Sequence, residues 1–285
     1  MHEGVIIKGI GGFYYVLSGG NVYECKARGI FRKEKITPLA GDNVEFEEKN
    51  GKGSIVRILS RKNFLIRPPV ANVDRLVIVI AASAPEPNTV LIDKMLIQAM
   101  QNGIEAVICI NKSELASRDD IEEAYSAAGY TVICVSAEKR ENLSALHELT
   151  RGRITAFAGA SGVGKSSLLN ALTGAGMETG ELSEKILRGK NTTRHVELIP
   201  IENGFVFDTP GFTSFEIGKI EPQELYKFYP EIEKYSGMCR YRDCAHTREQ
   251  TDCAVKDALE DGKISKIRYD SYCELYKLLK ENKTF

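Results

Sequence analysis

Residues 159–166 read Gly-Ala-Ser-Gly-Val-Gly-Lys-Ser, and this stretch decides the fold. It follows the apolar segment Ile154–Ala158, which predicts a strand, and it opens a helical pattern that continues through Leu172. Glycines let backbone N–H groups turn inward around phosphate oxygens, and the N-terminus of a helix adds positive partial charge. In this strand–loop–helix setting, Gly-x4-Gly-Lys-Ser predicts a phosphate-binding loop rather than a chance match.

Each position of this loop has an expected role. Lys165 should reach the β- and γ-phosphates of a nucleotide, and Ser166 should place its hydroxyl on Mg²⁺. Lys165 also neutralises charge that develops during phosphoryl transfer, so we expect it to be catalytic. The predicted nucleotide contacts in the loop are Gly159, Ala160, Ser161, Gly162, Val163, Gly164, Lys165, Ser166 and Ser167.

Two candidate base-reading motifs precede the loop. Asn-Lys-x-Asp after a strand is a guanine-reading pattern, because its carboxylate accepts hydrogen bonds from two donors on the guanine edge. Here Glu114 supplies the carboxylate and is one methylene longer than aspartate. Both motifs follow apolar strands, which disfavours a generic P-loop kinase or ATPase. The predicted guanine-site residues are Asn111, Lys112, Ser113, Glu114, Ser136 and Ala137.

Candidate switch elements follow the loop. Asp208-Thr-Pro-Gly211 comes after the strand Phe205–Phe207, where an Asp contacts Mg²⁺ and the Gly N–H contacts the γ-phosphate. Thr192 and Thr193 follow Ser166 by 26 and 27 residues, a spacing along the sequence that suits a switch threonine bound to Mg²⁺. The sequence leaves open which of the two binds. In an ordinary small GTPase the phosphate loop comes before the base-reading motifs, so this order indicates a circular permutation.

The group that positions the attacking water is not the usual one. Phe212 stands after Gly211, where many GTPases have a water-orienting glutamine. His195, two residues past Thr193, is the best replacement within the switch, because a histidine of near-neutral pKa can orient water or accept its proton. An exposed loop histidine is an equally good interpretation. The predicted catalytic residues are His195, Lys165 and Thr193.

A second chemical centre lies near the C-terminus. Cys-x4-Cys-x-His-x6-Cys places three thiolates and one imidazole within 15 residues. This ligand set predicts one closed structural zinc site and leaves no open position for catalysis. Metal binding would supply folding energy to a segment of 67 residues that is too small for a large core of its own. The predicted zinc ligands are Cys239, Cys244, His246 and Cys253.

The N-terminal segment predicts a small barrel. Five β-branched or aromatic runs, separated by glycine-rich turns, fit into about 60 residues, which suits an OB-type barrel; an SH3-like barrel fits the pattern as well. Five of the ten residues in 26–35 are basic, so this segment is either an RNA contact or a solvated charged loop. The candidate RNA-binding residues are Lys26, Arg28, Arg32, Lys33 and Lys35.

Composition and the spacing of apolar residues divide the chain of 285 residues into three parts. We expect an OB-type RNA-binding domain over 1–65, a P-loop GTPase domain with a parallel α/β sheet over 66–218, and a helical zinc-binding domain over 219–285. Arg67-Pro68-Pro69 marks the first linker. The net charge is −1, so nucleic-acid contacts would need local patches such as residues 1–65, with 11 basic and 7 acidic residues. The longest apolar run, Leu76–Ala84, is too short to cross a bilayer, so we expect a cytoplasmic protein. We also expect a monomer.

Together these features closely resemble one family, the bacterial circularly permuted RsgA (YjeQ) GTPases. The resemblance covers the whole chain and rests on the barrel, the permuted order, Thr-Thr-x-His at 192–195, the phosphate loop and the Cys/His cluster. It implies hydrolysis of GTP to GDP and phosphate, stimulated by the small (30S) ribosomal subunit during its late maturation, with Mg²⁺, one Zn²⁺ and contacts to 16S rRNA. It also supports a hydrolytic role for His195. Glu114 and a zinc loop one residue longer depart from the family pattern.

Two other functions remain compatible with parts of the pattern. Phe212 would suit a non-enzymatic RNA-binding assembly factor that uses nucleotide as a structural ligand. The phosphate loop alone would suit a metabolic P-loop kinase or ATPase. Turnover separates the first alternative from a GTPase, and a comparison of GTP with ATP binding separates the second.

Overall fold

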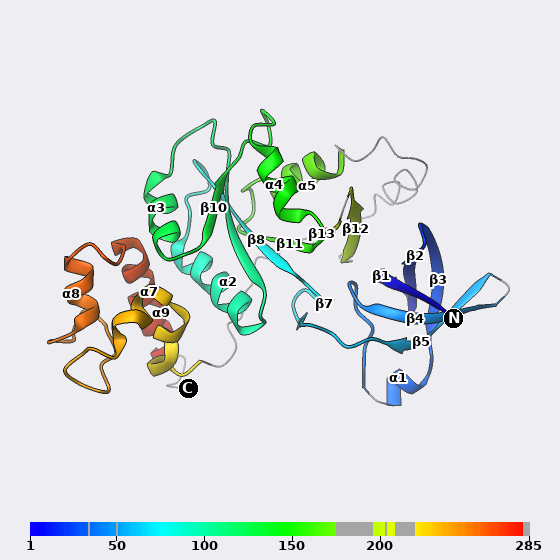
Figure 1. Ribbon diagram of the computed structural model, residues 1–285, viewed down its shortest axis with the longest axis horizontal. Helices are drawn as coiled ribbons and strands as arrows, with labels where there is room; N and C mark the ends of the chain where they lie inside the picture. The colour runs from blue at the N-terminus through cyan, green and yellow to red at the C-terminus, as the bar shows by residue number, and fades with distance from the viewer. Residues whose placement is uncertain (34, 50, 175–195, 203, 209–219, 282–285) are drawn as a thin grey trace.

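The computed structural model describes residues 1–33, 35–49, 51–174, 196–202, 204–208 and 220–281. Figure 1 shows three parts in a row: a β-barrel from the N-terminal residues, a central sheet flanked by helices, and a group of helices from the C-terminal residues. Within the described part of the chain, no helix is both long and apolar enough to span a membrane.

The N-terminal strands form a closed five-stranded barrel. They are β1 (His2–Ile10), β2 (Phe13–Ser18), β3 (Asn21–Ala27), β4 (Asn43–Lys49) and β5 (Lys52–Ile58), and a short helix, α1 (Ile30–Lys33), follows β3. The strands pair in the order β1-β2-β3-β5-β4 and close through β1–β4, with β3 and β5 parallel. All five predicted strands are confirmed, and this closure is that of an OB-type Greek-key barrel. Ile6, Val16, Val44, Phe46 and Ile55 fill its interior.

The central sheet is parallel except at one edge. Its strands are β8 (Arg75–Ala81), β9 (Glu105–Asn111), β10 (Thr131–Cys134), β11 (Ile154–Ala158), β12 (Glu197–Ile201) and β13 (Gly204–Asp208). They lie in the order β10-β9-β8-β11-β13-β12, and only β12 runs antiparallel to its neighbour β13. The predicted parallel sheet is therefore confirmed, whereas the antiparallel edge strand is an element that sequence reasoning missed.

Helices cover both faces of this sheet, as expected for a parallel sheet. They are α2 (Thr89–Gln101), α3 (Asp119–Ala127), α4 (Leu143–Thr150) and α5 (Lys165–Gly174). Successive residues of β8 point to opposite faces: Ile78 packs with Ile92 of α2, while Val79 packs in a second cluster with Leu168 of α5. The carboxyl ends of the parallel strands lie at one edge, where the loops after β9, β10 and β11 begin and where β13 ends at Asp208.

The barrel and the sheet are joined by strand pairing. Glu197 of β12 pairs with Lys8 of β1, which makes one continuous sheet of eleven strands, and the two side chains form an ion pair of 2.9 Å. Val5 and Ile7 of the barrel belong to the same apolar core as Phe207 of the sheet. The barrel is therefore packed against the central sheet rather than tethered to it.

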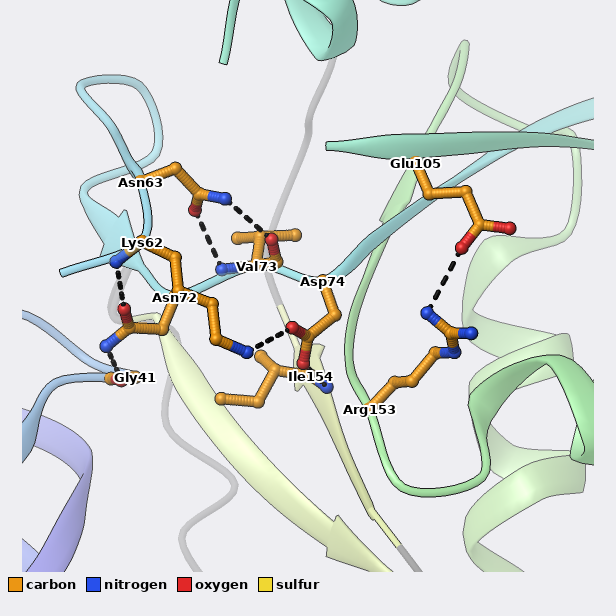
Figure 2. A network of polar contacts seen from close by, with 9 residues as sticks. All are labelled: Gly41, Lys62, Asn63, Asn72, Val73, Asp74, Glu105, Arg153 and Ile154. Atoms are coloured by element: carbon orange, nitrogen blue, oxygen red, sulfur yellow. Dashed lines mark hydrogen bonds and ion pairs between the residues drawn. The ribbon is translucent and has the colours of Figure 1, made fainter. Parts of the chain in front are cut away.

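The predicted linker at residues 67–69 is the tip of a structured hairpin, β6 (Phe64–Leu65) with β7 (Val70–Ala71). Figure 2 shows the polar contacts that fix it. The Asn72 side chain accepts from Lys62 N (2.9 Å) and donates to Gly41 O of the barrel (2.8 Å). Asp74 accepts from Ile154 N of the sheet (2.8 Å). The β6–β7 hairpin and the residues after it are therefore hydrogen-bonded to both the barrel and the central sheet.

The C-terminal residues form η1 (Pro222–Phe228), α7 (Pro230–Ser236), α8 (Ala254–Glu260) and α9 (Lys266–Glu281), and residues 220–281 contain no strand, as predicted. Their apolar core includes Leu225, Ile232 and Leu275, together with Val90 and Ile97 of α2. The helical group therefore shares its core with one face of the central domain.

A buried ion pair crosses the same contact. Arg268 of α9 donates to Asp93 of α2 and, through Nε, to Glu231 (2.7 Å), and both Arg268 and Asp93 are only 1% exposed. The hydroxyls of Tyr125 and Tyr229 each donate to Asp93 at 2.9 Å. Burial opposes the charge of Arg268, but Asp93 and Glu231 outweigh it and raise its pKa well above the usual value. The α9–α2 contact is therefore anchored by a permanent charge.

Candidate functional site

The phosphate loop leaves β11 and enters α5 in a conformation that needs glycine. Gly159, Gly162 and Gly164 have φ of +141°, +83° and +95°, a region that other residues rarely adopt. A Cβ on Gly159 would lie 2.1 Å from Val79 O, and one on Gly164 would lie 2.2 Å from Asn111 Nδ2. Both glycines are therefore required by contacts outside the loop as well as by the turn.

Lys165 points back over the loop. Its Nζ donates to Gly159 O (2.8 Å) and Ala160 O (2.7 Å), and partial burial lowers its pKa. Ser166 and Ser167 are exposed in the first turn of α5. The loop thus presents a cation and two hydroxyls beside the N-terminus of a helix, an arrangement suited to phosphate groups.

Asn111 joins the predicted base-reading loops to the phosphate loop. Its Nδ2 donates to Val163 O (2.9 Å), its Oδ1 accepts from Ala137 N (3.1 Å), and the residue is 2% exposed. Lys112 donates from Nζ to Gly162 O (2.8 Å) and to Ala84 O (2.7 Å). Three segments that are distant in sequence therefore form one site, and Asn111 holds them together.

Glu114 faces the Ser136 loop. A hydrogen bond with Ser136, which is fully buried, lowers the pKa of Glu114, so its side chain is a carboxylate at neutral pH. Its Oε2 is covered by protein yet has no hydrogen-bond partner among the described residues. Ser113 N is held by Val135 O at 3.2 Å. An ionised, unsatisfied acceptor in this position fits the donors on the edge of guanine.

Asp208 ends β13, the strand next to the phosphate-loop strand β11. Its side chain is exposed, and partial desolvation raises its pKa. A carboxylate here fits the hard oxygen ligands that Mg²⁺ prefers. The other switch predictions fall outside the described residues and stay predictions: Thr192, Thr193, His195, Gly211 and Phe212.

The four predicted metal ligands converge. Their ligand atoms all lie within 4.8 Å of one another. Cys239 Sγ lies 3.4 Å from His246 Nδ1 and 3.9 Å from Cys253 Sγ, and Cys253 Sγ lies 3.7 Å from His246 Nδ1. A zinc tetrahedron with its usual bond lengths has edges of about 3.6 Å between N and S and about 3.8 Å between two S atoms. Cys239, His246 and Cys253 therefore have the spacing of a tetrahedral metal site, and Cys244 lies within 4.8 Å of all three as a fourth candidate ligand.

The basic segment of the barrel is partly neutralised. Arg28 forms an ion pair of 2.9 Å with Glu47, and Lys26 lies over the ring of Phe13, 4.8 Å from its centroid. Lys33 and Lys35 are exposed, whereas the side chain of Arg32 lies outside the described part of the chain. Of these residues, Arg28 is paired with an acid, Lys26 keeps its charge over an aromatic ring, and Lys33 and Lys35 face solvent, so the RNA contact stays a prediction.

Sequence reasoning missed the segment after β8. Ala84 accepts from Lys112, and Pro85 lies 3.8 Å from where a Cβ on Gly162 would stand. The residues 82–88 therefore lie against the tip of the phosphate loop. No sequence motif predicts this contact. It arises because β8 pairs in parallel with both β9 and β11, which brings the carboxyl ends of the three strands together.

Comparison with known proteins agrees with this architecture. Residues 58–218 match the RsgA GTPase family and residues 3–56 match the RsgA N-terminal domain. The chain is 46% identical to the small ribosomal subunit biogenesis GTPase RsgA of Alkaliphilus metalliredigens, over 100% of both chains. It is 45% identical to that of Bacillus subtilis, over 99% of both.

Solved structures similar to this chain agree with these family matches. The chain matches the crystal structure of YloQ, a circularly permuted GTPase, with 41% identity, a TM-score of 0.80 and coverage of 99% of this chain and 96% of that one. YjeQ from Thermotoga maritima matches with 34% identity and a TM-score of 0.80 over 98% of both chains. A metabolic kinase and a non-enzymatic factor are thereby set aside, and the chain belongs to the RsgA family of circularly permuted GTPases.

Proposed function

We propose that this chain hydrolyses GTP to GDP and phosphate on the small (30S) ribosomal subunit during its late maturation, in the cytoplasm and as a monomer. The observation that carries the proposal is the site built around Asn111, which joins the loops after β9, β10 and β11. The names of full-length relatives supply the ribosomal context. In the proposed division, residues 1–65 contact RNA, 66–218 bind GTP, and 219–285 hold the metal.

The proposed roles follow from the placement of the side chains. The backbone of Gly159–Ser167 surrounds the phosphates, and Lys165 moves from its carbonyl partners to the β- and γ-phosphates. Ser166, Asp208 and either Thr192 or Thr193 would hold Mg²⁺, which neutralises charge on the phosphates. His195 would orient the attacking water, and Gly211 would contact the γ-phosphate. Glu114 would accept from guanine.

Replacing Gly164 by alanine is expected to abolish tight GTP binding. The new methyl group would stand 2.2 Å from Asn111 Nδ2 and would also require a strained φ of +95°. Relief of the clash breaks the Asn111 bridge between the loops. Binding of a fluorescent GTP analogue measures the loss, and Gly174→Ala, at the open end of α5, is the matched control. Unchanged affinity in Gly164→Ala would show that the loop can adapt.

Replacing Glu114 by alanine is expected to weaken GTP binding by about tenfold to a hundredfold, since hydrogen bonds to a charged group are lost. Affinity for ATP should stay low and unchanged, because adenine does not offer the two donors. Glu138→Ala, an exposed carboxylate in the next loop, should bind GTP normally. Equal loss in both variants would mean that Glu114 acts only through general charge.

We propose that the Cys/His cluster binds one structural Zn²⁺. Cys244→Ala is expected to lose the metal and unfold the C-terminal helices, because zinc binding supplies folding energy to such small units. Metal content and the helical signal of circular dichroism report both effects. Cys134→Ala, a partly buried thiol of β10, is the control and should keep one zinc per chain. A variant that retains zinc would remove Cys244 from the ligand set.

Association with the ribosome tests the partner. The protein should sediment with purified small subunits in the presence of a non-hydrolysable GTP analogue, and much less with GDP or with large subunits. The contact would involve 16S rRNA and the basic residues Lys26, Arg28, Arg32, Lys33 and Lys35, and it should weaken with salt as phosphate contacts do. Equal sedimentation with both subunits would contradict the proposed partner.

A further inference from the structure

The linker hairpin β6–β7 exposes its apolar side chains. Phe64 is 51% exposed and Ile66 is 77% exposed, whereas Leu65 and Val70, on the other face, are 4% and 0% exposed and belong to the central core. Alternation along β6 thus turns Leu65 inward and Phe64 outward, and Ile66 follows in the exposed turn. Large apolar side chains that gather on a fixed surface indicate a contact with a partner.

The ring of Phe64 is held in place by a cation. The guanidinium of Arg61 lies 5.7 Å from the ring centroid. That guanidinium is itself fixed by two bonds to Asp42, at 2.7 and 2.8 Å, and by one to Thr37 O at 2.7 Å. The ring is consequently preorganised, and a partner that stacks on it would lose little conformational entropy.

The backbone below this ring is equally rigid. Asn63 exchanges two hydrogen bonds with the backbone of Val73, at 2.8 and 2.9 Å, and Asn72 ties the hairpin to the barrel (Figure 2). Phe64 therefore projects from an element that is anchored to both the barrel and the central sheet.

The surroundings are basic. Arg67 is exposed at the tip of the hairpin, and Lys35 is exposed on the segment that leads to Thr37. Asp42 is fully buried and forms an ion pair with Arg61, which offsets the charge of that guanidinium. Ile36, between Lys35 and Thr37, is 41% exposed. An apolar ring among cations suits an anionic partner with flat faces.

A groove of about 320 Å³ adjoins the hairpin. Thr37 and Pro38 line one part of it, Pro69 of the hairpin lines another, and Ile10 and Phe13 of the barrel complete it. A flexible chain that lies across the hairpin could therefore continue into a hollow instead of leaving the surface.

We propose that the hairpin surface, defined by Arg61, Phe64, Ile66 and Arg67, binds single-stranded RNA by stacking a base on Phe64, which Arg61 orients, while the exposed side chains of Lys35 and Arg67 contact phosphates. Unpaired bases offer π-faces to aromatic side chains, and a duplex hides them. This inference rests on the proposed RNA-binding function and adds to it a contact outside residues 26–35, the segment from which that function was inferred.

Fluorescence anisotropy with a labelled single-stranded RNA of about a dozen nucleotides tests the surface in the full-length protein. Phe64→Leu keeps an apolar side chain but removes the π-face, and it should weaken RNA binding about tenfold. Phe64→Tyr keeps the ring and should bind within about twofold of the wild type. Arg67→Gln should reduce the slope of log K against log salt by about 0.7. Val22→Ser, an exposed apolar residue of the barrel, is the control.

Each outcome decides the matter. Weaker RNA binding in Phe64→Leu but not in Phe64→Tyr or Val22→Ser supports the proposal. Normal RNA binding by Phe64→Leu overturns it and leaves the proposed RNA-binding function intact. Normal RNA binding combined with weaker binding to purified small subunits also overturns it, because the hairpin would then contact a protein. A wild type that binds no RNA overturns both. Phe64 is exposed, so unchanged thermal unfolding is expected for every variant.

Discussion

Replacing Arg268 by methionine is expected to lower the free energy of unfolding by about 3–5 kcal/mol, because it leaves two buried carboxylates, Asp93 and Glu231, without their cation. Asp93 is 1% exposed and lies between α2 and α9, so water cannot replace the guanidinium without opening the contact. Tyr125 and Tyr229 would still donate to Asp93, but hydroxyls do not neutralise a charge. Urea unfolding followed by circular dichroism measures the change.

Two further variants separate the buried charge from lost packing. Arg248→Met removes an exposed arginine that pairs with Asp270, and it should cost no more than about 1 kcal/mol. The double variant Arg268→Met with Asp93→Asn removes both charges of the buried pair and should recover part of the stability. If Arg268→Met and Arg248→Met cost the same, the buried pair does not anchor the helical group to α2.

Replacing Lys165 by alanine is expected to reduce GTP turnover by about 10²–10³-fold, the effect of removing one preorganised group that stabilises a developing charge. Lys165 is the cation of the phosphate loop, and its two carbonyl partners keep it within reach of bound phosphates. Phosphate release at saturating GTP measures the loss. A smaller loss of GDP affinity than of turnover would show that Lys165 acts in the transition state.

The control for Lys165 is Lys277→Ala, an exposed lysine of α9 far from the loop in sequence. It should turn over GTP at the rate of the wild type. A Lys165→Ala variant that keeps turnover within about twofold would contradict the assigned role, since a lost phosphate contact cannot be neutral.

Much of the fold follows from local patterns, and the exceptions have physical causes. The barrel strands and β8, β9, β11 and β13 are apolar or alternating runs bounded by turns. β12 escaped prediction because it contains Pro200. Proline is tolerated there because β1 pairs with β12 only at Glu197, so the side of Pro200 away from β13 is not paired. α4 is short and begins after Asn142, whose φ is +55°, without a capping hydrogen bond. Neither element carries a strong local signal.

The β6–β7 hairpin could not be predicted from the sequence for a different reason, because long-range contacts hold it. Asn72 binds Gly41, 31 residues away, and Asp74 binds Ile154, 80 residues away. From the adjacent sequence alone, two successive prolines indicate a linker. Contacts over such separations depend on the assembled fold, and no periodicity reveals them.

The candidate site divides in the same way. The phosphate loop and the Cys/His cluster were predictable because their ligands are close in sequence and their spacing is dictated by phosphate and metal geometry. The bridge from Asn111 to Val163 spans 52 residues and appears only in three dimensions. The ion pair of Arg28 with Glu47, on another strand, likewise appears only in three dimensions.

The central claim is that hydrolysis by this GTPase depends on the small ribosomal subunit. Phosphate release from GTP, measured with and without purified small subunits, tests it directly, with large subunits and ATP as controls. We expect slow turnover by the protein alone and strong stimulation by small subunits but not by large ones, with GTP but not with ATP. Tight GTP binding without any stimulation, or equal stimulation by both subunits, would contradict it.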